Sequence, residues 1–294
     1  MSEPIKLRMA PRESAQEIAA RVEREQRRVD AAREEALATS LAPFRVGSVP
    51  FLNAVPLTRG LEEQIQFLPP SELARRLQRK ELDAALVSIT EPLLNPGYWI
   101  LDGVAVASLG EVKSVFLAHR GSIEQITEVH CDTASLTSVN LLRVLLAERG
   151  LAPRFVPLDP SVSPEKAPDA LLLIGDRAIE FLRGKPQHQI WDLGAAWLEL
   201  TKLPFVYAVW AIRKDVPGVE RLARELREAK AFGLDTLDFI INQREEFDLE
   251  FRRDYLSWHI HYHLGADEKR GVAKFVELLG RHLETTVFAP EYLP

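Results

Sequence analysis

Short apolar runs alternate with amphipathic stretches along the chain from residue 44 onward. Residues 44–49, 83–88 and 114–119 are rich in apolar side chains, many of them β-branched or aromatic, and each segment predicts a short strand. Residues 205–212 (FVYAVWAI) are apolar without interruption, which is typical of a strand that is covered on both faces. Strands separated by helices predict an α/β architecture with mainly parallel sheets.

Helical periodicity fills most of the remaining segments. The hydroxyl of Ser71 can cap a helix that begins SELARRLQRKEL. Residues 137–150 predict another helix, because apolar side chains recur on one face and Gly150 stands where a glycine commonly ends a helix. The side chains on that face are Val139, Leu142, Leu145 and Leu146. Residues 169–182 (DALLLIGDRAIEFL) predict a strand, a sharp turn and a helix, and the chain after residue 212 is largely helical.

The first 43 residues have a different character. They contain eight Lys or Arg and eight Asp or Glu residues, so this segment is neutral and the rest of the chain carries the net charge of −6. Charged residues at helical spacing predict a helix supported by ion pairs, with few apolar positions. We therefore expect an appended helix that docks weakly on the body of the protein, or that contacts a partner or a second copy of the chain.

Composition and charge narrow the class of protein further. The net charge of −6 argues against a broad nucleic-acid-binding surface. The longest apolar stretch, residues 203–212, is far shorter than the ~20 residues that cross a bilayer, and the N-terminal segment lacks the apolar core of a secretory signal. The single cysteine, Cys131, excludes an internal disulfide and suits a reducing compartment. These features predict a cytoplasmic protein that binds neither nucleic acid nor membrane.

Several common catalytic signatures are absent from the sequence. It contains no GxGxxG, GxxxxGK[ST], HExxH or CxxC motif, which disfavours nucleotide binding and common zinc chemistry. His259 and His263 would share one face of a helix while His261 would point elsewhere, and no nearby acidic residue completes a metal-binding spacing. We therefore expect a packed or solvated helix face here. Cys131 lacks a neighbour that would lower its pKa, so we expect it to pack at a strand end.

Polar clusters stand at the ends of several predicted strands. They occupy residues 47–56, 87–92, 111–116, 132–140 and 174–178. In open α/β sheets, ligands bind beyond the carboxyl ends of the strands. A helix start that carries hydroxyls, such as Ser135, Thr137 and Ser138, can bind an anion through its free N–H groups and the positive end of the helix dipole. These clusters together predict one shared ligand-binding cleft.

In these clusters and their order, the chain resembles the menaquinone-biosynthesis chorismate dehydratases of the futalosine pathway. The resemblance covers residues from about 44 to about 283, nearly everything but the appended helix. The stretches that carry it are RVGSVPFLNAVPLTRGL, ELDAALVSITEPL, GEVKSVFLAHRGSIEQI, CDTASLTSVNLLRVLLAERG, DALLLIGDRAI, WDLGAAWLELTKLPFVYAVWAIR and YLSWHIHYHLG. It implies the two-lobed fold of type II periplasmic binding proteins. We expect the first lobe to comprise residues 44–106 and 211–294, and the second to comprise residues 107–210.

The resemblance also implies a substrate and a set of site residues. The substrate would be chorismate, which loses water to give 3-(1-carboxyvinyloxy)benzoate, and no cofactor is implied. Asn53 would hold the hydroxyl or the developing negative charge, because an amide donates and accepts hydrogen bonds without titrating. The expected substrate-binding residues are Ser48, Ser88, Ser114, Ser135, Thr137, Ser138 and Asp176. Apart from Glu91 and Asp176, the matched clusters contain no histidine or obvious carboxylate pair, so we hypothesise that the substrate's own side-chain carboxylate removes the ring proton. Asp176 and Glu91 are the alternatives for the acid or base.

The chain departs from the pattern of the family at two positions. Many relatives place an arginine where this chain has Leu136, and some place one where it has Val55. A doubly negative substrate would be attracted to such cations. The sequence leaves Lys113, Arg177 and Arg45 as substitutes and does not choose among them.

Other functions remain open on the same scaffold. The chain could be a non-catalytic carboxylate-binding protein or sensor, because one fold serves many functions. It could also be another menaquinone-pathway enzyme, such as the sibling that makes dihydroxynaphthoate. Incubation with chorismate separates these hypotheses, because only the dehydratase converts it to an aromatic product.

Overall fold

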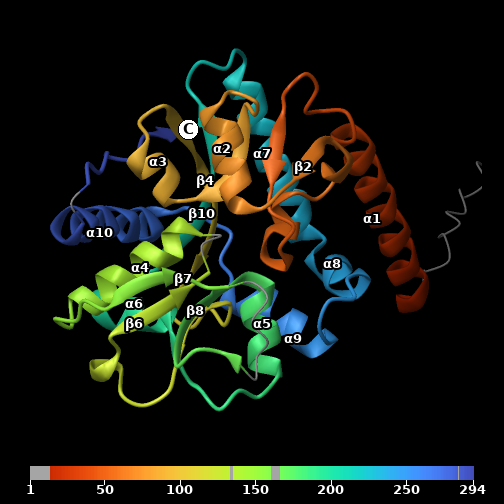
Figure 1. Ribbon diagram of the computed structural model, residues 1–294. Helices are drawn as coiled ribbons and strands as arrows, with labels where there is room; N and C mark the ends of the chain where they lie inside the picture. The colour runs from red at the N-terminus through yellow and green to blue at the C-terminus, as the bar shows by residue number, and fades with distance from the viewer. Residues whose placement is uncertain (1–13, 133–134, 160–165, 284) are drawn as a thin grey trace, which may run out of the picture.

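The computed structural model describes residues 14–132, 135–159, 166–283 and 285–294. Two lobes, each built around one β-sheet, lie one above the other in Figure 1. The predicted two-lobed α/β architecture is therefore confirmed.

The sheet of the first lobe, sheet A, has the strand order β11-β4-β10-β3-β1-β2. Its strands are β1 (Val46–Ser48), β2 (Ile65–Phe67), β3 (Ala84–Ser88), β4 (Tyr98–Ser108), β10 (Phe205–Arg213) and β11 (Tyr292–Leu293). The pairs β1–β2, β1–β3 and β4–β11 are parallel, whereas β10 runs antiparallel to both of its neighbours, β3 and β4.

The sheet of the second lobe, sheet B, has the strand order β7-β6-β8-β5-β9. Its strands are β5 (Val115–His119), β6 (Glu128–Cys131), β7 (Arg154–Pro157), β8 (Ala170–Ile174) and β9 (Gln189–Asp192). β6 is parallel to β7 and β8, whereas β5 is antiparallel to β8 and β9.

Both sheets are therefore mixed, but in each of them one strand runs against all the others, β10 in sheet A and β5 in sheet B. The expectation of mainly parallel sheets is confirmed. Every antiparallel pair involves β5 or β10. With these two strands the chain enters sheet B and returns to sheet A, so their direction is set by the passage between the lobes. β10 pairs within sheet A along its whole length, so residues 205–210 lie with the first lobe rather than the second.

Helices surround both sheets (Figure 1). The α-helices are α1 (Ala15–Leu37), α2 (Pro70–Gln78), α3 (Thr90–Leu94), α4 (Leu136–Ala147), α5 (Gly175–Arg183), α6 (Leu193–Thr201), α7 (Val219–Asp235), α8 (Leu237–Gln243), α9 (Leu249–Asp254) and α10 (Ala266–His282). Short 3-10 turns are η1 (Leu52–Leu57), η2 (Glu62–Gln64) and η3 (Ile123–Gln125), and a π-helical turn, η5 (Tyr255–His259), follows α9. No helix in the described part of the chain is long and apolar enough to cross a membrane.

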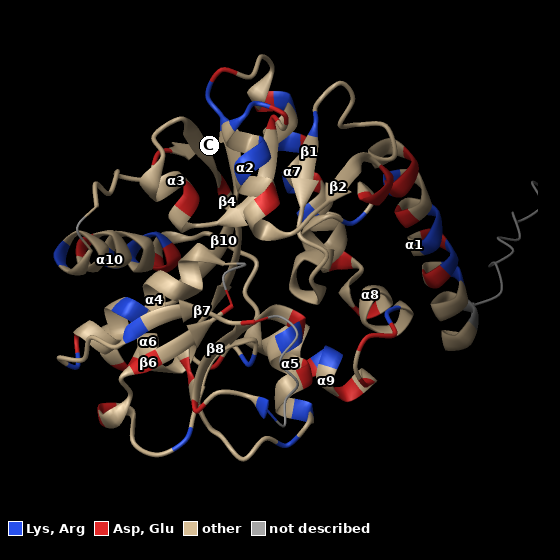
Figure 2. Ribbon diagram, viewed as in Figure 1, with Lys and Arg blue, Asp and Glu red and all other residues tan. Residues whose placement is uncertain are grey.

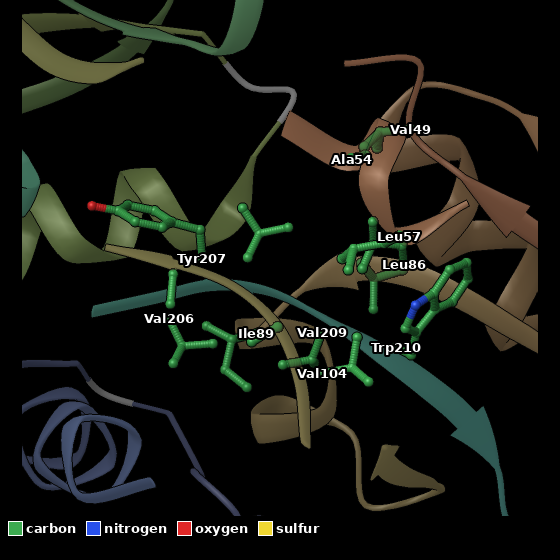
Figure 3. Close-up of a cluster of buried hydrophobic side chains, with 14 of the residues drawn as sticks. Val49, Ala54, Leu57, Leu86, Ile89, Val104, Val206, Tyr207, Val209 and Trp210 are labelled. Atoms are coloured by element: carbon green, nitrogen blue, oxygen red, sulfur yellow. The ribbon is translucent and has the colours of Figure 1, made fainter. Parts of the chain in front are cut away.

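The hydrophobic core continues from one lobe into the other. Within sheet A, apolar side chains of β3, β4 and β10 pack together, among them Val104 and Trp210 (Figure 3). Where the lobes meet, Trp197 of α6, Phe205 of β10 and Phe275 of α10 pack edge to face. Their ring centroids lie 5.1 Å apart for Trp197 and Phe205 and 5.0 Å apart for Phe205 and Phe275. Aromatic packing of this kind adds to the burial of apolar surface that joins the lobes.

The predicted appended helix is α1, and its C-terminal half docks on the first lobe. Leu37 is buried, and Arg33 forms ion pairs with Glu228 and Asp235 of α7 at 2.8 Å each. The earlier turns are exposed and carry charges of both signs, as Figure 2 shows. The helix is thus anchored at one end only, and contact of its exposed part with a partner or a second copy stays a prediction.

The C-terminal region contacts both lobes. Lys113 Nζ donates a hydrogen bond of 2.5 Å to Asp254 at the end of α9, and His259 Nδ1 lies 2.8 Å from the carbonyl oxygen of Glu111. Two residues later, His261 forms an antiparallel bridge with Ala107, at the end of β4. Residues 249–259 therefore pack beside the second lobe, although the sequence assigns them to the first.

A close helix contact positions the segment that carries Asn53. Gly233 of α7 faces η1, and a Cβ atom at this position would lie 1.9 Å from the carbonyl oxygen of Pro56. Only a residue without a side chain allows α7 and η1 to approach this closely. The contact fixes the place of η1 on the first lobe.

We predict that Gly233→Ala destabilises the protein, because the added methyl group forces α7 and η1 apart. The expected loss in the free energy of unfolding is about 1–3 kcal/mol, measured by urea titration. Gly280→Ala in α10 is the matched control, since a Cβ atom there meets nothing within 4 Å. Alanine at this helical position should stabilise the protein by about 0.5–1 kcal/mol. Equal effects of the two substitutions would contradict the packing argument.

Candidate functional site

A cavity lies between the lobes, at the ends of strands from both sheets. It encloses about 590 Å³ of empty space, part of which opens to solvent. The first lobe contributes Val49, Phe51, Asn53, Pro70, Leu86, Val87, Ser88, Val106, Tyr207 and Ala208, and the second contributes Val112, Ser114, Val115, Ser135, Ser138, Ile174 and Gly175. None of these described lining residues carries a charge. The cavity is therefore apolar with a few hydroxyl groups and one side-chain amide.

The amide of Asn53 is held by a hydrogen-bond chain. Asn53 lies in η1, and its Nδ2 donates to the hydroxyl oxygen of Tyr255 at 3.2 Å. The Tyr255 hydroxyl in turn donates to Ser114 Oγ at 2.8 Å. Burial raises the pKa of Tyr255 well above its ordinary value, so its hydroxyl stays protonated. Two predicted site residues from different lobes, Asn53 and Ser114, are thus brought together.

The N-terminus of α4 forms another part of the wall. Ser135 caps this helix, because its hydroxyl oxygen accepts from the backbone N–H of Ser138 at 3.3 Å. The Ser138 hydroxyl donates to the same oxygen at 3.2 Å, and Ser88 of β3 reaches it from the other lobe at 3.1 Å. The structure brings these three predicted residues together where a helix dipole favours an anion.

Two other predicted residues do not line the cavity. Thr137 is buried, and its Oγ1 accepts from the backbone N–H of Thr90 at 3.0 Å and lies 2.9 Å from the Thr90 hydroxyl. Thr137 therefore joins α4 of one lobe to α3 of the other. Ser48 is also buried, and its hydroxyl has no partner among the described residues.

Asp176 lies just behind the cavity wall, in the first turn of α5. Its Oδ1 is 3.4 Å from the backbone N of Leu52, the residue before Asn53. Burial raises the pKa of Asp176 to about 6, because the ionised carboxylate loses solvation that the single long hydrogen bond from Leu52 does not replace. Glu246 and Glu180 raise this pKa further and Arg244 lowers it. Asp176 can therefore exchange a proton near neutral pH.

A side hollow adjoins the main cavity, and its lining includes the positively charged side chain of Arg75. It is lined by Pro70, Ser71, Ala74, Arg75, Gln78, Ser88, Glu91 and Leu136. Pro70 and Ser88 belong to both walls, so the two spaces are neighbours. Glu91 is buried, accepts from Gln78 Nε2 at 2.8 Å and has a raised pKa because of its burial. Arg75 Nη2 lies 2.5 Å from Glu72.

The three cations that the sequence suggests have different positions. Arg45 forms an ion pair of 2.8 Å with Asp83. Arg45 directly precedes β1 and Asp83 directly precedes β3, so the pair lies at the N-terminal ends of these strands, whereas the cavity lies at their C-terminal ends. Lys113 adjoins the lining residue Ser114, and its ammonium group is paired with Asp254. Arg177 follows Asp176 in α5 and lies 3.9 Å from Asp132. Of these, only Lys113 and Arg177 stand close in sequence to residues of the cavity wall.

The histidine run does not form a metal site in the part of the chain that the structure describes. The helical turn ends at His259, and His261 lies in a β-bridge, so the expected shared helix face of His259 and His263 does not exist. No group of three or more potential metal ligands gathers among the described residues. Cys131 packs at the end of β6 as expected, and burial raises the pKa of its thiol to about 12, which makes it a poor nucleophile.

Sequence reasoning missed several residues that shape the site. Tyr255 begins the segment YLSWHIHYHLG, but nothing in that segment indicates a contact with Asn53. Thr90 belongs to a quoted polar cluster, but its link to Thr137 is visible only in the fold. Phe51 faces Gly175, whose φ of +58° places its backbone in the left-handed region that suits glycine.

Two curated proteins resemble this chain along most of its length. The chain is 33% identical over 281 residues to a chorismate dehydratase of Thermus thermophilus, and the match covers 86% of this chain and 100% of the relative. A chorismate dehydratase of Campylobacter jejuni subsp. jejuni is 25% identical, with 77% of this chain and 89% of that protein covered.

Among solved structures, the periplasmic aliphatic sulphonate binding protein SsuA from Escherichia coli has a similar fold. Its TM-score is 0.53 at 13% sequence identity, and the match covers 85% of this chain and 93% of that protein. At this identity the likeness concerns the fold alone. A family model described as menaquinone biosynthesis matches residues 44–281. The chain therefore belongs to the menaquinone biosynthesis family, with the two-lobed fold of the periplasmic binding proteins.

Proposed function

We propose that this protein is a chorismate dehydratase, an enzyme that eliminates water from chorismate to give 3-(1-carboxyvinyloxy)benzoate in menaquinone biosynthesis. The observation that carries the proposal is the cavity between the lobes, in which Asn53 and Ser114 meet the start of α4. The family membership and the names of the two curated relatives supply the substrate. We expect the enzyme to act in the cytoplasm on this small anion, without a cofactor, nucleic acid or membrane.

The start of α4 is suited to one substrate carboxylate. Ser135 and Ser138 present hydroxyls there, and the first backbone N–H groups of a helix have no partner within the helix. Their partial positive charge attracts an anion in a cavity whose lining includes no carboxylate among the described residues. Ser88 reaches the same place from β3, so both lobes contribute to this subsite.

The elimination itself needs few protein groups. The C–H bond of the ring carbon that bears the ether breaks, and its electron pair forms the new ring double bond. The neighbouring C–O bond breaks, and the hydroxyl departs with a proton as water. We assign Asn53 to the departing hydroxyl or the charge that develops on it, and Ser114 lies beside it as a donor.

The base that takes the ring proton is then the substrate's own side-chain carboxylate. The described lining of the cavity holds no histidine, lysine or carboxylate that could act in its place. Asp176 is a protein alternative, because its pKa of about 6 allows it to accept a proton and its carboxylate contacts the backbone of Leu52, beside Asn53. Glu91, in the adjoining side hollow, is another. A closed cavity holds the carboxylate and the ring in one arrangement, which favours this elimination over competing rearrangements.

We assign Arg75 to the second substrate carboxylate. It shares the side hollow with Leu136 and with Ser88, which also lines the main cavity. Glu72 is paired with Arg75 and also with Arg76, at 2.6 Å, so one carboxylate faces two guanidinium groups. Glu81 also lies 3.9 Å from Arg76, and Glu91 lines the hollow beside Arg75, so the guanidinium group of Arg75 is the group in this lining that can bind an incoming anion. Lys113 and Arg177 stay alternatives for the same role.

The purified protein should convert chorismate to an aromatic product that has lost one water. Ultraviolet spectra and mass analysis of the reaction detect this change directly. Binding of chorismate without turnover would instead favour a binding protein or sensor, and neither binding nor turnover would contradict the proposal.

Within this assay, Asn53→Ala should lower kcat by about 100-fold or more, because it removes a polar group aimed at the departing hydroxyl. Its thermal melt should stay almost unchanged, since Asn53 makes one side-chain hydrogen bond. Asn242→Ala is the matched control, because Asn242 is an exposed residue of α8 outside the cavity lining. Full activity of Asn53→Ala would remove Asn53 from the mechanism.

Arg75→Gln should raise KM for chorismate by about 10-fold and change kcat less, because it removes a charged partner of a carboxylate. Arg76→Gln serves as the control, since Arg76 shares Glu72 with Arg75 but does not line the side hollow. Steady-state kinetics of both variants decide the point. An equal rise in KM for the two variants would point to a general effect of charge rather than to a contact with substrate.

Asp176→Asn should change the pH dependence of stability. The native pKa of about 6 lies above the ordinary value of 3.8, so the folded state binds more protons than the unfolded state between these values. Asp176 therefore makes wild-type stability fall as pH rises from about 4 to above about 6, and asparagine removes this fall. Urea titrations should show the variant more stable than wild type at about pH 8 and equal to it at about pH 4. A loss of kcat in this variant would make Asp176 the base.

A further inference from the structure

Tyr255 connects two polar groups of the cavity lining. It is buried and does not itself line the cavity, and its hydroxyl contacts Asn53 of the first lobe and Ser114 of the second. We propose that Tyr255 is a positioning residue that fixes the amide of Asn53 and the hydroxyl of Ser114 in the orientations that the elimination needs. This inference rests on the proposed dehydratase function.

The hydrogen bonds from Asn53 through Tyr255 to Ser114 run in one direction, which is set by the single proton of the Tyr255 hydroxyl. The Tyr255 hydroxyl has one proton, which it donates to Ser114 Oγ at 2.8 Å. It can therefore only accept from Asn53, and this selects the Nδ2 end of the amide, at 3.2 Å. A phenol that donates in one direction and accepts from the other orients both of its neighbours.

This direction determines what the cavity offers to a ligand. The Ser114 oxygen is already an acceptor for Tyr255, so the Ser114 proton is free to point toward the cavity. Asn53 retains its Oδ1 atom and a second N–H, and its side chain has no other partner among the described residues. Asn53 and Ser114 thus each present a donor to the departing hydroxyl. Hydrogen bonds that are linked in one series, as these are through Tyr255, strengthen each other.

The surroundings of Tyr255 hold its ring in place. Phe251, one turn earlier, stacks on the ring at a centroid distance of 5.4 Å and an interplanar angle of 19°. Asp254 is tied to Lys113 at 2.5 Å, and Asp248 at the start of α9 forms an ion pair with Arg183 of α5. These pairs tie the segment of Tyr255 to the second lobe, whereas Arg252 of α9 donates to the carbonyl oxygen of Ile241 in α8, which contacts η1 of the first lobe.

Asn53, by contrast, is carried by η1 on the first lobe. The bond from Asn53 to Tyr255 joins residues 202 positions apart. Together with the bond from Tyr255 to Ser114, it links η1 of the first lobe to the start of β5 in the second. The orientation of the Asn53 amide therefore depends on the packing of the two lobes seen in this structure.

Tyr255→Phe tests the proposal, because it deletes one oxygen and retains the ring. Once wild type is shown to convert chorismate, the variant should lower kcat by about 10- to 100-fold with little change in KM. The double variant Tyr255→Phe with Ser114→Ala should lose less kcat than the sum of the two single losses, because both changes remove the same bond between Tyr255 and Ser114. Tyr262→Phe is the matched control, since Tyr262 is also buried and its hydroxyl has no partner among the described residues. This control should retain full kcat.

A crystal structure of Tyr255→Phe supplies a readout that does not depend on activity. It should show the Asn53 amide turned from its wild-type orientation. Unchanged kcat, additive losses in the double variant, or an unmoved amide would each overturn the proposal. If wild type does not convert chorismate, the proposed function fails, and the orientation of the amide still decides whether Tyr255 positions Asn53.

Discussion

The site depends on polar contacts that hold two lobes together around a small cavity. Thr90 and Thr137 form a buried hydroxyl pair between α3 and α4, and Ser88 reaches Ser135 at the cap of α4. Each contact joins an element of the first lobe to an element of the second. A buried hydroxyl without a partner is costly, so such pairs favour the arrangement in which both partners meet. The cavity and its lining exist only in that arrangement.

The lining is suited to a reaction that is thermodynamically favourable but has to be directed along one of several possible routes. Aromatisation of a ring is favourable in itself, so the enzyme has to hold one geometry and stabilise charge on the departing group. Hydroxyls, a helix start and one amide can do this without a charged group in the described wall. The charges stand in an outer layer instead, with Arg75 in the side hollow, and Lys113 and Asp176 behind the wall. Such a layout keeps the reacting atoms in an apolar space.

Much of the fold follows from local patterns. The apolar runs predicted β3, β5 and β10, the four-residue apolar face predicted α4, and the charged N-terminal segment predicted α1. These elements depend on periodicity and composition, which are properties of neighbouring residues. Strand direction was harder to predict, because β5 and β10 take their direction from the passage between lobes. That passage is a property of the whole chain.

The sequence by itself determined which kinds of side chain stand at the strand ends. These side chains indicated an anionic ligand, and their order indicated the resemblance to a family. Only the tertiary structure decided which of them face the cavity. Ser138 lines it whereas Thr137, the preceding residue of the same helix, bonds to Thr90, because successive helical residues point in different directions. The fold alone also brought Tyr255 to Asn53, since contacts between distant segments depend on how the lobes pack and leave no local pattern.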